Sequence, residues 1–172
     1  MLLVFLRHGP AGHADASRWP DDRDRPLTTR GIERTRRAVR GLAGLLGRVD
    51  RVWSSPLARA CATAELLRHA WAEAPALDVV EELAPGGRAL PLVREWVRRA
   101  KGETLVLVGH EPDLSALAAS LCGVEAHALG LKKTGALAVE FEPGASPTGG
   151  HLAWLVPPRV LRSLPRGRKV ES

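Results

Sequence analysis

The sequence predicts an α/β protein with three layers, α/β/α, built on a mostly parallel central sheet with an antiparallel C-terminal strand. Helix and strand patterns alternate through roughly the first 125 residues, which is typical of a parallel sheet covered by helices on both faces. Two apolar runs, 2–6 and 105–108, each end abruptly in a turn that carries a histidine. Because ligands of open α/β sheets bind at the carboxyl ends of strands, we expect a site at these two turns.

Six segments have the length and composition of strands. The run at 104–108 has the strongest pattern and the run at 77–80 the weakest. The last two segments are expected to pair as an antiparallel hairpin. In chain order the six segments are Leu2–Leu6, Arg51–Ser54, Leu77–Val80, Thr104–Val108, Ala136–Phe141 and His151–Leu155.

Four amphipathic segments between the strands predict helices. The first carries its apolar residues at Ile32, Val39, Leu42, Leu45 and Leu46. The second carries them at Leu57, Ala60, Cys61, Ala64, Leu67 and Trp71. The third is expected over 90–100, and the fourth over 112–121 with an inner face of Leu114, Leu117, Ala118 and Leu121.

Proline precedes two of these helices, at Ser55-Pro56 and at Glu111-Pro112. Both prolines are expected at the first helical position, so that the free N–H groups of each helix start face the strand ends and attract anions. The polar stretch 9–26 is too long for a tight connection, and we expect it to lie over or beside the site.

Composition and length indicate one soluble domain. The chain has 172 residues, 45% of them hydrophobic and 26% charged, and no apolar run approaches the roughly 18 residues of a membrane helix. The apolar N-terminus lacks a basic start and a cleavage site, so it predicts a strand and a cytoplasmic protein. We expect a single domain over 1–158 and a basic tail over 159–172. The two cysteines, Cys61 and Cys122, suggest no disulfide, and Cys61 is expected to be a buried thiol.

The net charge of +6 comes mostly from arginine, whose planar fork suits phosphate. A modest positive excess is usual for a solvated surface, and the chain has no tyrosine and only two phenylalanines on which bases could stack. Nucleic acid is therefore disfavoured as a partner, and no membrane partner is expected. The sequence leaves the oligomeric state open.

Four residues are expected to meet at one edge of the sheet. Arg7 and His8 end the first strand, Arg59 lies one turn into the second helix, and His110 follows the strongest strand. This arrangement favours a phosphate pocket with a histidine nucleophile. The other histidines, His13, His69, His127 and His151, are interpreted as surface residues.

Four motifs follow one another along the chain. They are Arg7-His8-Gly9, Asp22-x-x-Arg25-Pro26-Leu27-Thr28-x-x-Gly31, Ser54-Ser55-Pro56-Leu57-x-Arg59-Ala60-x-x-Thr63-Ala64 and Val108-Gly109-His110-Glu111-Pro112. In this order they resemble the histidine phosphatase superfamily, the phosphoglycerate mutase-like fold, and within it the SixA-like phosphohistidine phosphatases. The resemblance spans residues 2 to about 156, with Leu131-Lys132-Lys133 and Trp154-x-x-x-Pro158 as further matches.

The resemblance implies a metal-independent phosphatase that needs no cofactor. His8 would attack phosphorus in line and form a phosphohistidine that water then hydrolyses. Arg7, Arg59 and His110 would bind the equatorial oxygens of the phosphoryl group, where charge accumulates during transfer. The neighbouring arginines would keep His8 neutral, as a nucleophile must be.

One departure from the wider superfamily bears on the substrate. Many members carry a glutamate in a helical insertion, whereas this chain passes quickly from Val80 into the next helix. Glu81 and Glu82 remain candidates for the general acid, although adjacent carboxylates are more often solvated charges. An imidazole leaving group relaxes the need for an acid, which favours phosphohistidine on a signalling protein. A small phosphorylated metabolite is the alternative substrate, and a non-catalytic phosphate or nucleic-acid binder is the second alternative.

Overall fold

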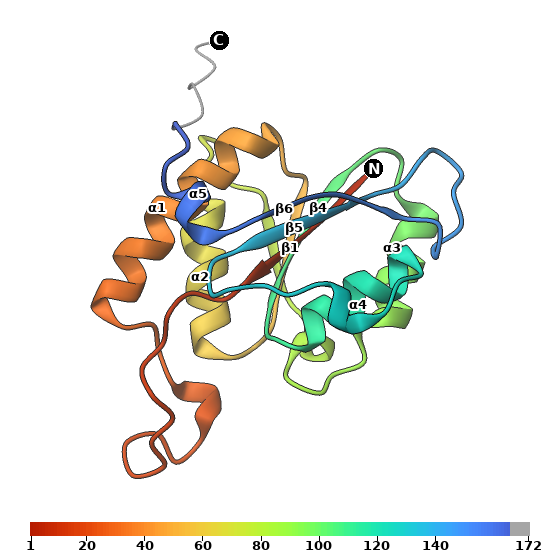
Figure 1. The fold of residues 1–172 in the computed structure, drawn as a ribbon. Helices are drawn as coiled ribbons and strands as arrows, with labels where there is room; N and C mark the ends of the chain where they lie inside the picture. Colours follow the sequence, from red (N-terminus) through yellow and green to blue (C-terminus); the bar gives the residue numbers. More distant parts are fainter. Residues whose placement is uncertain (166–172) are drawn as a thin grey trace.

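The computed structural model describes residues 1–165, and a six-stranded mixed sheet lies at the centre of the fold (Figure 1). The strand order is β3-β2-β4-β1-β5-β6. β1 to β4 are parallel, while β5 runs antiparallel to β1 and pairs with β6 as an antiparallel hairpin. The predicted fold class is confirmed. The strands are β1 (Leu2–Arg7), β2 (Arg51–Ser54), β3 (Ala76–Val79), β4 (Thr104–Gly109), β5 (Ala136–Glu140) and β6 (His151–Val156).

Helices cover both faces of the sheet (Figure 1). α1 (Thr29–Leu46), α2 (Ala58–Arg68) and the short α5 (Pro158–Leu161) pack on one face. α3 (Ala89–Arg99) and α4 (Asp113–Cys122) pack on the other. Three single-turn 3₁₀ helices lie in the connections, η1 (Asp22–Asp24), η2 (Glu81–Leu83) and η3 (Ala126–Ala128).

The continuous apolar run of β1 is explained by burial on both faces of the sheet. Side chains of a strand alternate between faces, so Leu3 and Phe5 pack against α3 and α4 while Val4 and Leu6 pack against α1 and α2. All four side chains are fully buried. A central strand of this kind shows no polar alternation, because neither of its faces meets water.

The register of the central strands places three strand ends side by side. Arg7 of β1 is paired with Gly109 of β4, and Ser54 of β2 is paired with Val108 of β4. The residues that follow these strands, His8 and His110 among them, therefore emerge at the same edge of the sheet. This adjacency is the condition on which the predicted site depends.

Several local predictions were wrong. Neither proline is at the first helical position, because α2 begins at Ala58 and α4 at Asp113, with Pro112 as its N-cap. Before α2 the chain bends at 56–57, and Leu57 is the N-cap with an extended backbone whose N–H donates to the Ser55 hydroxyl, so the helix starts later than the proline suggests. Leu45 is 45% exposed, since it lies off the stripe of α1 that faces the sheet.

The second predicted helix is also shorter than expected. α2 ends at Arg68, and Trp71 lies beyond it, where its indole N–H donates to the carbonyl of Gly47. Cys61 is a free thiol that is only partly buried, and its Sγ donates to the carbonyl of Ser55. The thiol faces the turn before the helix and not the core, which corrects the expectation of a buried cysteine.

The predicted basic tail begins inside a packed helix. Leu161 of α5 is fully buried against α1, where its carbonyl approaches Gly41 so closely that a Cβ there would lie 1.9 Å from the carbonyl oxygen. Residues 166–172 of that tail lie outside the described residues. Within residues 1–165, no helix is both long enough and apolar enough to cross a membrane.

Candidate active site

His8 directly follows β1 and is held by backbone hydrogen bonds. Its N–H donates to the carbonyl of Gly109 on β4, at 3.0 Å, and its ring Nδ1 lies 2.7 Å from the carbonyl of Gly9. A carbonyl oxygen can only accept, so Nδ1 carries the proton of the neutral ring and Nε2 keeps a free lone pair. The geometry therefore leaves Nε2 as the nitrogen of His8 that is able to act as a nucleophile.

Burial keeps the His8 ring neutral. Only 6% of the residue is exposed, and this burial lowers the pKa of His8 to about 3. The hydrogen bond to Gly9 opposes the decrease, while the nearby charges of His110, Arg59 and Arg7 add to it. A neutral imidazole with a free lone pair is the form that can attack phosphorus.

His110 follows β4, and its ring centroid lies 5.0 Å from that of His8. Its Nε2 and the hydroxyl of Ser55, at the end of β2, share a hydrogen bond of 2.8 Å. Burial, together with the positive charge of Arg59, lowers the pKa of His110 to about 4. Two imidazoles at this separation can contact one tetrahedral anion between or beside them.

Arg7 is anchored at one end of its guanidinium. Its Nη1 donates to the carbonyl of Leu131, in the loop before β5, at 2.7 Å. The loop in turn holds the backbone of β1, because the N–H of Thr134 donates to the carbonyl of Arg7. Thr134 adopts a left-handed conformation with φ of 61°, which turns the chain into β5.

Arg59 lies in the first turn of α2 and is anchored by Asp22 of η1. Nη1 donates to the Asp22 carbonyl at 2.8 Å and Nη2 to its carboxylate at 2.9 Å. The carboxylate also accepts from Nε of Arg25, and this hydrogen bond, with the charge of Arg59, lowers the pKa of Asp22. Burial lowers the pKa of Arg59, whose side chain is 5% exposed. Asp22 thus fixes the far end of a buried guanidinium.

Both arginines keep an unused donor. The Nε atoms of Arg7 and Arg59 are buried and have no hydrogen-bond partner. A buried N–H without a partner costs free energy, on the order of 1–3 kcal/mol, and more when the group is charged. The charges of Arg7 and Arg59 act on both histidines, so the site carries the positive charge that attracts an anion.

Gly9 is required by the close packing of the loop that leaves β1. Its N–H donates to the hydroxyl of Thr63 on α2, which donates in turn to the carbonyl of Arg59. A Cβ at Gly9 would lie 2.1 Å from the hydroxyl oxygen of Thr35 on α1. This packing places the carbonyl that orients His8.

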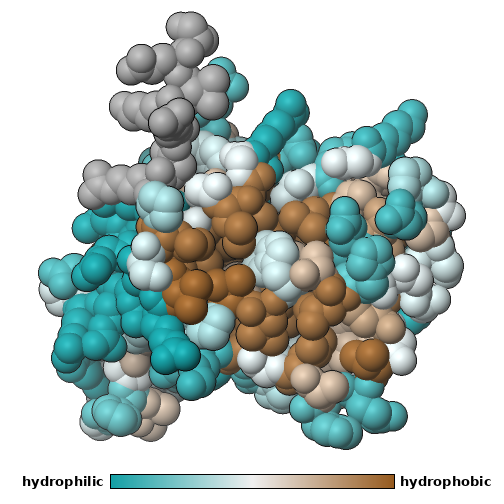
Figure 2. Space-filling view, turned by 45° about the horizontal axis from the view of Figure 1, so that its top comes forward, coloured by the Kyte–Doolittle hydropathy of each residue, from teal (hydrophilic) through white to brown (hydrophobic). Residues whose placement is uncertain are grey.

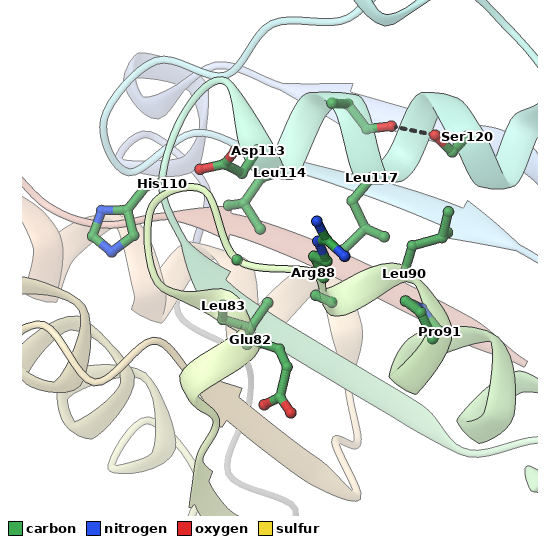
Figure 3. Close-up of a pocket in the computed structure, with 13 residues that line it drawn as sticks. Glu82, Leu83, Arg88, Leu90, Pro91, His110, Asp113, Leu114, Leu117 and Ser120 are labelled. Carbon is green, nitrogen blue, oxygen red and sulfur yellow. Dashed lines mark hydrogen bonds between the residues drawn. The ribbon is translucent and has the colours of Figure 1, made fainter.

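The structure does not bring the two predicted acids to the histidines. The carboxylate of Glu81 accepts from Arg23, which belongs to the loop 9–26, and the Glu81 side chain is 68% exposed. The carboxylate of Glu82 points away from His110 (Figure 3). Neither residue has a hydrogen bond to His8 or His110 among the described contacts.

Sequence reasoning missed several residues that surround the site. Asp22 and Ser55 lie within two of the sequence motifs, and their positions there are the only indication that the sequence gives of a role at the site. Lys133 also belongs to this neighbourhood, since burial and the charges of Arg7, Arg25 and Arg59 lower its pKa. The four other histidines are exposed, as expected of surface residues.

A mostly apolar recess of about 370 Å³ adjoins His110 (Figure 3). Its floor is formed by buried leucines of η2 and α4, and its rim carries Glu82, Arg88 and Asp113. The carboxylate of Asp113 accepts from the N–H of Gly86, which ties the loop after η2 to the start of α4. The leucines are Leu83, Leu114 and Leu117. Across residues 1–165, no three His, Cys, Asp or Glu side chains gather as a metal site would require.

Comparison with known proteins finds one matching family model and several curated relatives. The family model described as histidine phosphatase superfamily (branch 1) matches residues 3–85. Phosphohistidine phosphatase SixA of Escherichia coli is 31% identical over 125 residues, which cover 71% of this chain and 74% of that protein. An uncharacterised protein of Picosynechococcus sp. is 42% identical over 139 residues, covering 78% of this chain and 82% of that one.

Solved structures agree with the sequence relatives. The structure of the protein histidine phosphatase SixA complexed with tungstate superposes with a TM-score of 0.78 and 27% identity, covering 94% of this chain and 99% of that chain. Phosphoserine phosphatase of Entamoeba histolytica superposes with a TM-score of 0.69 and 17% identity, covering 95% and 99%. The second likeness concerns the fold alone.

Proposed function

Since the chain belongs to the histidine phosphatase superfamily and is a phosphatase, we propose that it removes phosphate from phosphohistidine on a protein, with His8 as the nucleophile. Nε2 of His8 attacks phosphorus in line, and the bond from phosphorus to the substrate imidazole breaks. The departing imidazole takes up a proton from solvent. Water then attacks the phosphorylated His8, which releases inorganic phosphate, restores the neutral ring and returns one proton to solvent.

One observation carries this proposal: the hydrogen bond from Nδ1 of His8 to Gly9, which leaves Nε2 unprotonated beside the buried Arg59 and the partly buried Arg7. The other groups have supporting roles in the proposal. Arg7, Arg59 and His110 bind the equatorial oxygens through charge-assisted hydrogen bonds.

Three features support phosphohistidine as the substrate. The chain goes from β3 through the single turn of η2 to α3, without a helical segment that would bring an acid over the site. An imidazole leaves without strong acid catalysis, whereas an alkoxide needs a proton. The recess beside His110 can accept apolar side chains that flank a phosphohistidine on a protein surface.

A small phosphomonoester is the second candidate, and a carboxylate at the rim of the recess is the observation that favours it. The recess itself fits either substrate, because its volume of about 370 Å³ also lies within the range of small-molecule sites, roughly 300–1,000 Å³. Asp113 at its rim supplies a carboxylate near His110, which an alkoxide leaving group would require.

The decisive experiment traps the phosphoenzyme. The protein is mixed with a histidine-containing phosphotransfer domain labelled on phosphohistidine and quenched in alkali, in which phosphohistidine survives. We expect label on the wild-type enzyme and on a His13→Ala control, and none on His8→Ala. Label that persists in His8→Ala contradicts the nucleophile, and turnover of sugar phosphates, nucleotides or phosphoserine without turnover of phosphohistidine contradicts the substrate.

A further inference from the structure

A second recess, of about 450 Å³, lies between the loop before β5, the end of β6 and α5. None of the residues proposed for catalysis lines it, so it is separate from the site around His8 and His110. Its size is within the range that small-molecule sites occupy, roughly 300–1,000 Å³.

The charged residues that line this recess are all cations. Lys132 comes from the loop, and Arg159 and Arg162 come from α5 and its C-terminal end. No carboxylate is among the lining residues, and no ion pair engages these three side chains within residues 1–165. Three cations around one concavity attract a negatively charged group.

The remaining wall of the recess is apolar. Leu131 is buried beneath it, and Leu155 is 38% exposed at the end of β6, next to Val156 and two prolines. Figure 2 shows a face of the molecule on which hydrophobic residues gather at the middle and hydrophilic residues lie around them. A ligand that matched both walls would carry an apolar body and an anionic head.

The loop that forms the recess also holds the active site. The carbonyl of Leu131 accepts from Nη1 of Arg7 at 2.7 Å, and the carbonyl of Gly135 accepts from the backbone N–H of Arg7 at 3.2 Å. The N–H of Gly135 donates to the carbonyl of Lys132, so one tight turn connects the recess with the arginine. A Cβ at Gly135 would lie 3.4 Å from Pro158, which shows how closely α5 packs on this turn.

We propose that this recess is a binding site for a small amphipathic anion, and that its occupancy tightens phosphate binding through Arg7. The anionic head contacts Lys132, Arg159 and Arg162, and the apolar body packs on Leu131 and Leu155. A ligand held against the loop favours the arrangement in which Leu131 anchors Arg7. By linkage, an anion bound at Arg7 must tighten ligand binding in the recess by the same factor.

Calorimetric titration of the full chain with octanoate tests the site. Octanoate combines the two required features, whereas acetate lacks the apolar body and octylammonium reverses the charge. Of the three compounds, we expect only octanoate to bind. Its Kd should rise at least about tenfold in the double variant Arg159→Glu/Arg162→Glu. The matched control is Arg36→Glu/Arg37→Glu, which makes the same charge change on the exposed face of α1, away from the recess. Equal binding by the two double variants overturns the site.

Tungstate tests the coupling. Saturating tungstate is expected to lower the Kd of octanoate about threefold, and octanoate to lower the Kd of tungstate by the same factor. An octanoate Kd that is unchanged or raised by tungstate overturns the coupling, and loss of octanoate binding would place octanoate in the active site. The variant His8→Ala must keep octanoate binding, so that failure of the recess and failure of the proposed phosphatase mechanism are told apart.

Discussion

The polar residues at the strand ends and those of the loop 9–26 are held in place by different interactions. His8 and His110 follow buried strands, are 6% and 4% exposed, and are oriented by the backbone and by a buried serine. The loop 9–26 instead depends on ion pairs at the surface, such as Arg23 with Glu81, whose side chains are 48% and 68% exposed. Asp22 is intermediate, since a half-exposed carboxylate anchors a buried arginine.

The difference suggests a division of roles. Groups fixed by the sheet are expected to keep their geometry when salt changes, because buried interactions are screened much less than exposed ones. Exposed ion pairs contribute little to stability, about 0–1 kcal/mol each, and can rearrange when a partner docks. We therefore expect substitutions at the strand ends to reduce activity most, and substitutions in the exposed loop to reduce it least.

The largest effect is expected at the end of β1. Replacing His8 with asparagine removes the free Nε2 and is expected to lower kcat by about 10⁴-fold or more, as loss of a nucleophile does. Steady-state hydrolysis of a phosphohistidine protein, with circular dichroism as a check of folding, measures this. A folded His8→Asn variant that kept a tenth of wild-type activity would remove the strand-end histidine from the mechanism.

Gly9→Ala should have the next largest effect, because the new Cβ collides with the Thr35 hydroxyl and displaces the carbonyl that orients His8. We expect kcat to fall about 100-fold, the size of effect that a displacement near 1 Å produces. Thr35→Ala in the same protein should restore part of the loss. Gly12→Ala is the control, since its Cβ meets only Thr28, at 4.0 Å, and a loss of similar size there would contradict the steric account.

Acidification should act on the strand ends through the histidines. The pKa of His8 is about 3 in the folded protein and about 6.5 when unfolded, so below pH 6.5 the unfolded chain binds more protons. The free energy of unfolding then decreases as pH falls. At pH 5, protonation of His8 in the unfolded chain lowers it by on the order of 2 kcal/mol.

Urea denaturation between pH 5 and 7 measures this slope, and His8→Asn should flatten it. Nitrogen chemical shifts of the rings provide a direct check, because His8 should remain neutral with its proton on Nδ1 at pH 5. A His8 ring that is protonated at pH 5.5 would contradict the burial argument.

A smaller effect is expected for the residue that connects the two regions. Asp22→Ala removes the carboxylate that anchors Nη2 of Arg59, and kcat should fall about tenfold with less change in KM. Asp24→Ala, in the same 3₁₀ turn, makes the same charge change and should leave kcat within about twofold. Equal effects in the two variants would show that charge, and not the orientation of Arg59, matters.

The smallest effect is expected at the surface. Glu81→Gln breaks the exposed pair with Arg23. The free energy of unfolding should change by less than about 1 kcal/mol, and the turnover of phosphohistidine by less than about threefold. Turnover of a phosphomonoester serves as a comparison in the same assay. A large loss restricted to the phosphomonoester would assign Glu81 to leaving-group protonation and favour the second candidate substrate.

Much of the fold could be predicted from local pattern. The strand at 51–54 was placed at its observed bounds, and β1 and β4 were placed to within one residue, because buried runs that end in Arg-His-Gly or Gly-His-Glu have clear limits. The ends of α2 were less certain, since proline marks the neighbourhood of a helix start and not its first residue.

The sequence by itself determined the layers of the fold, the three polar residues at its strand ends and the arginine in the first turn of α2, since apolar periodicity and turn residues are local signals. Only the tertiary structure decided what holds those residues. Asp22 anchors Arg59, Leu131 anchors Arg7 and Ser55 contacts His110 across separations of 37 to 124 residues. Such contacts depend on strand order and register, β2-β4-β1-β5, which place distant segments together and which no local pattern encodes.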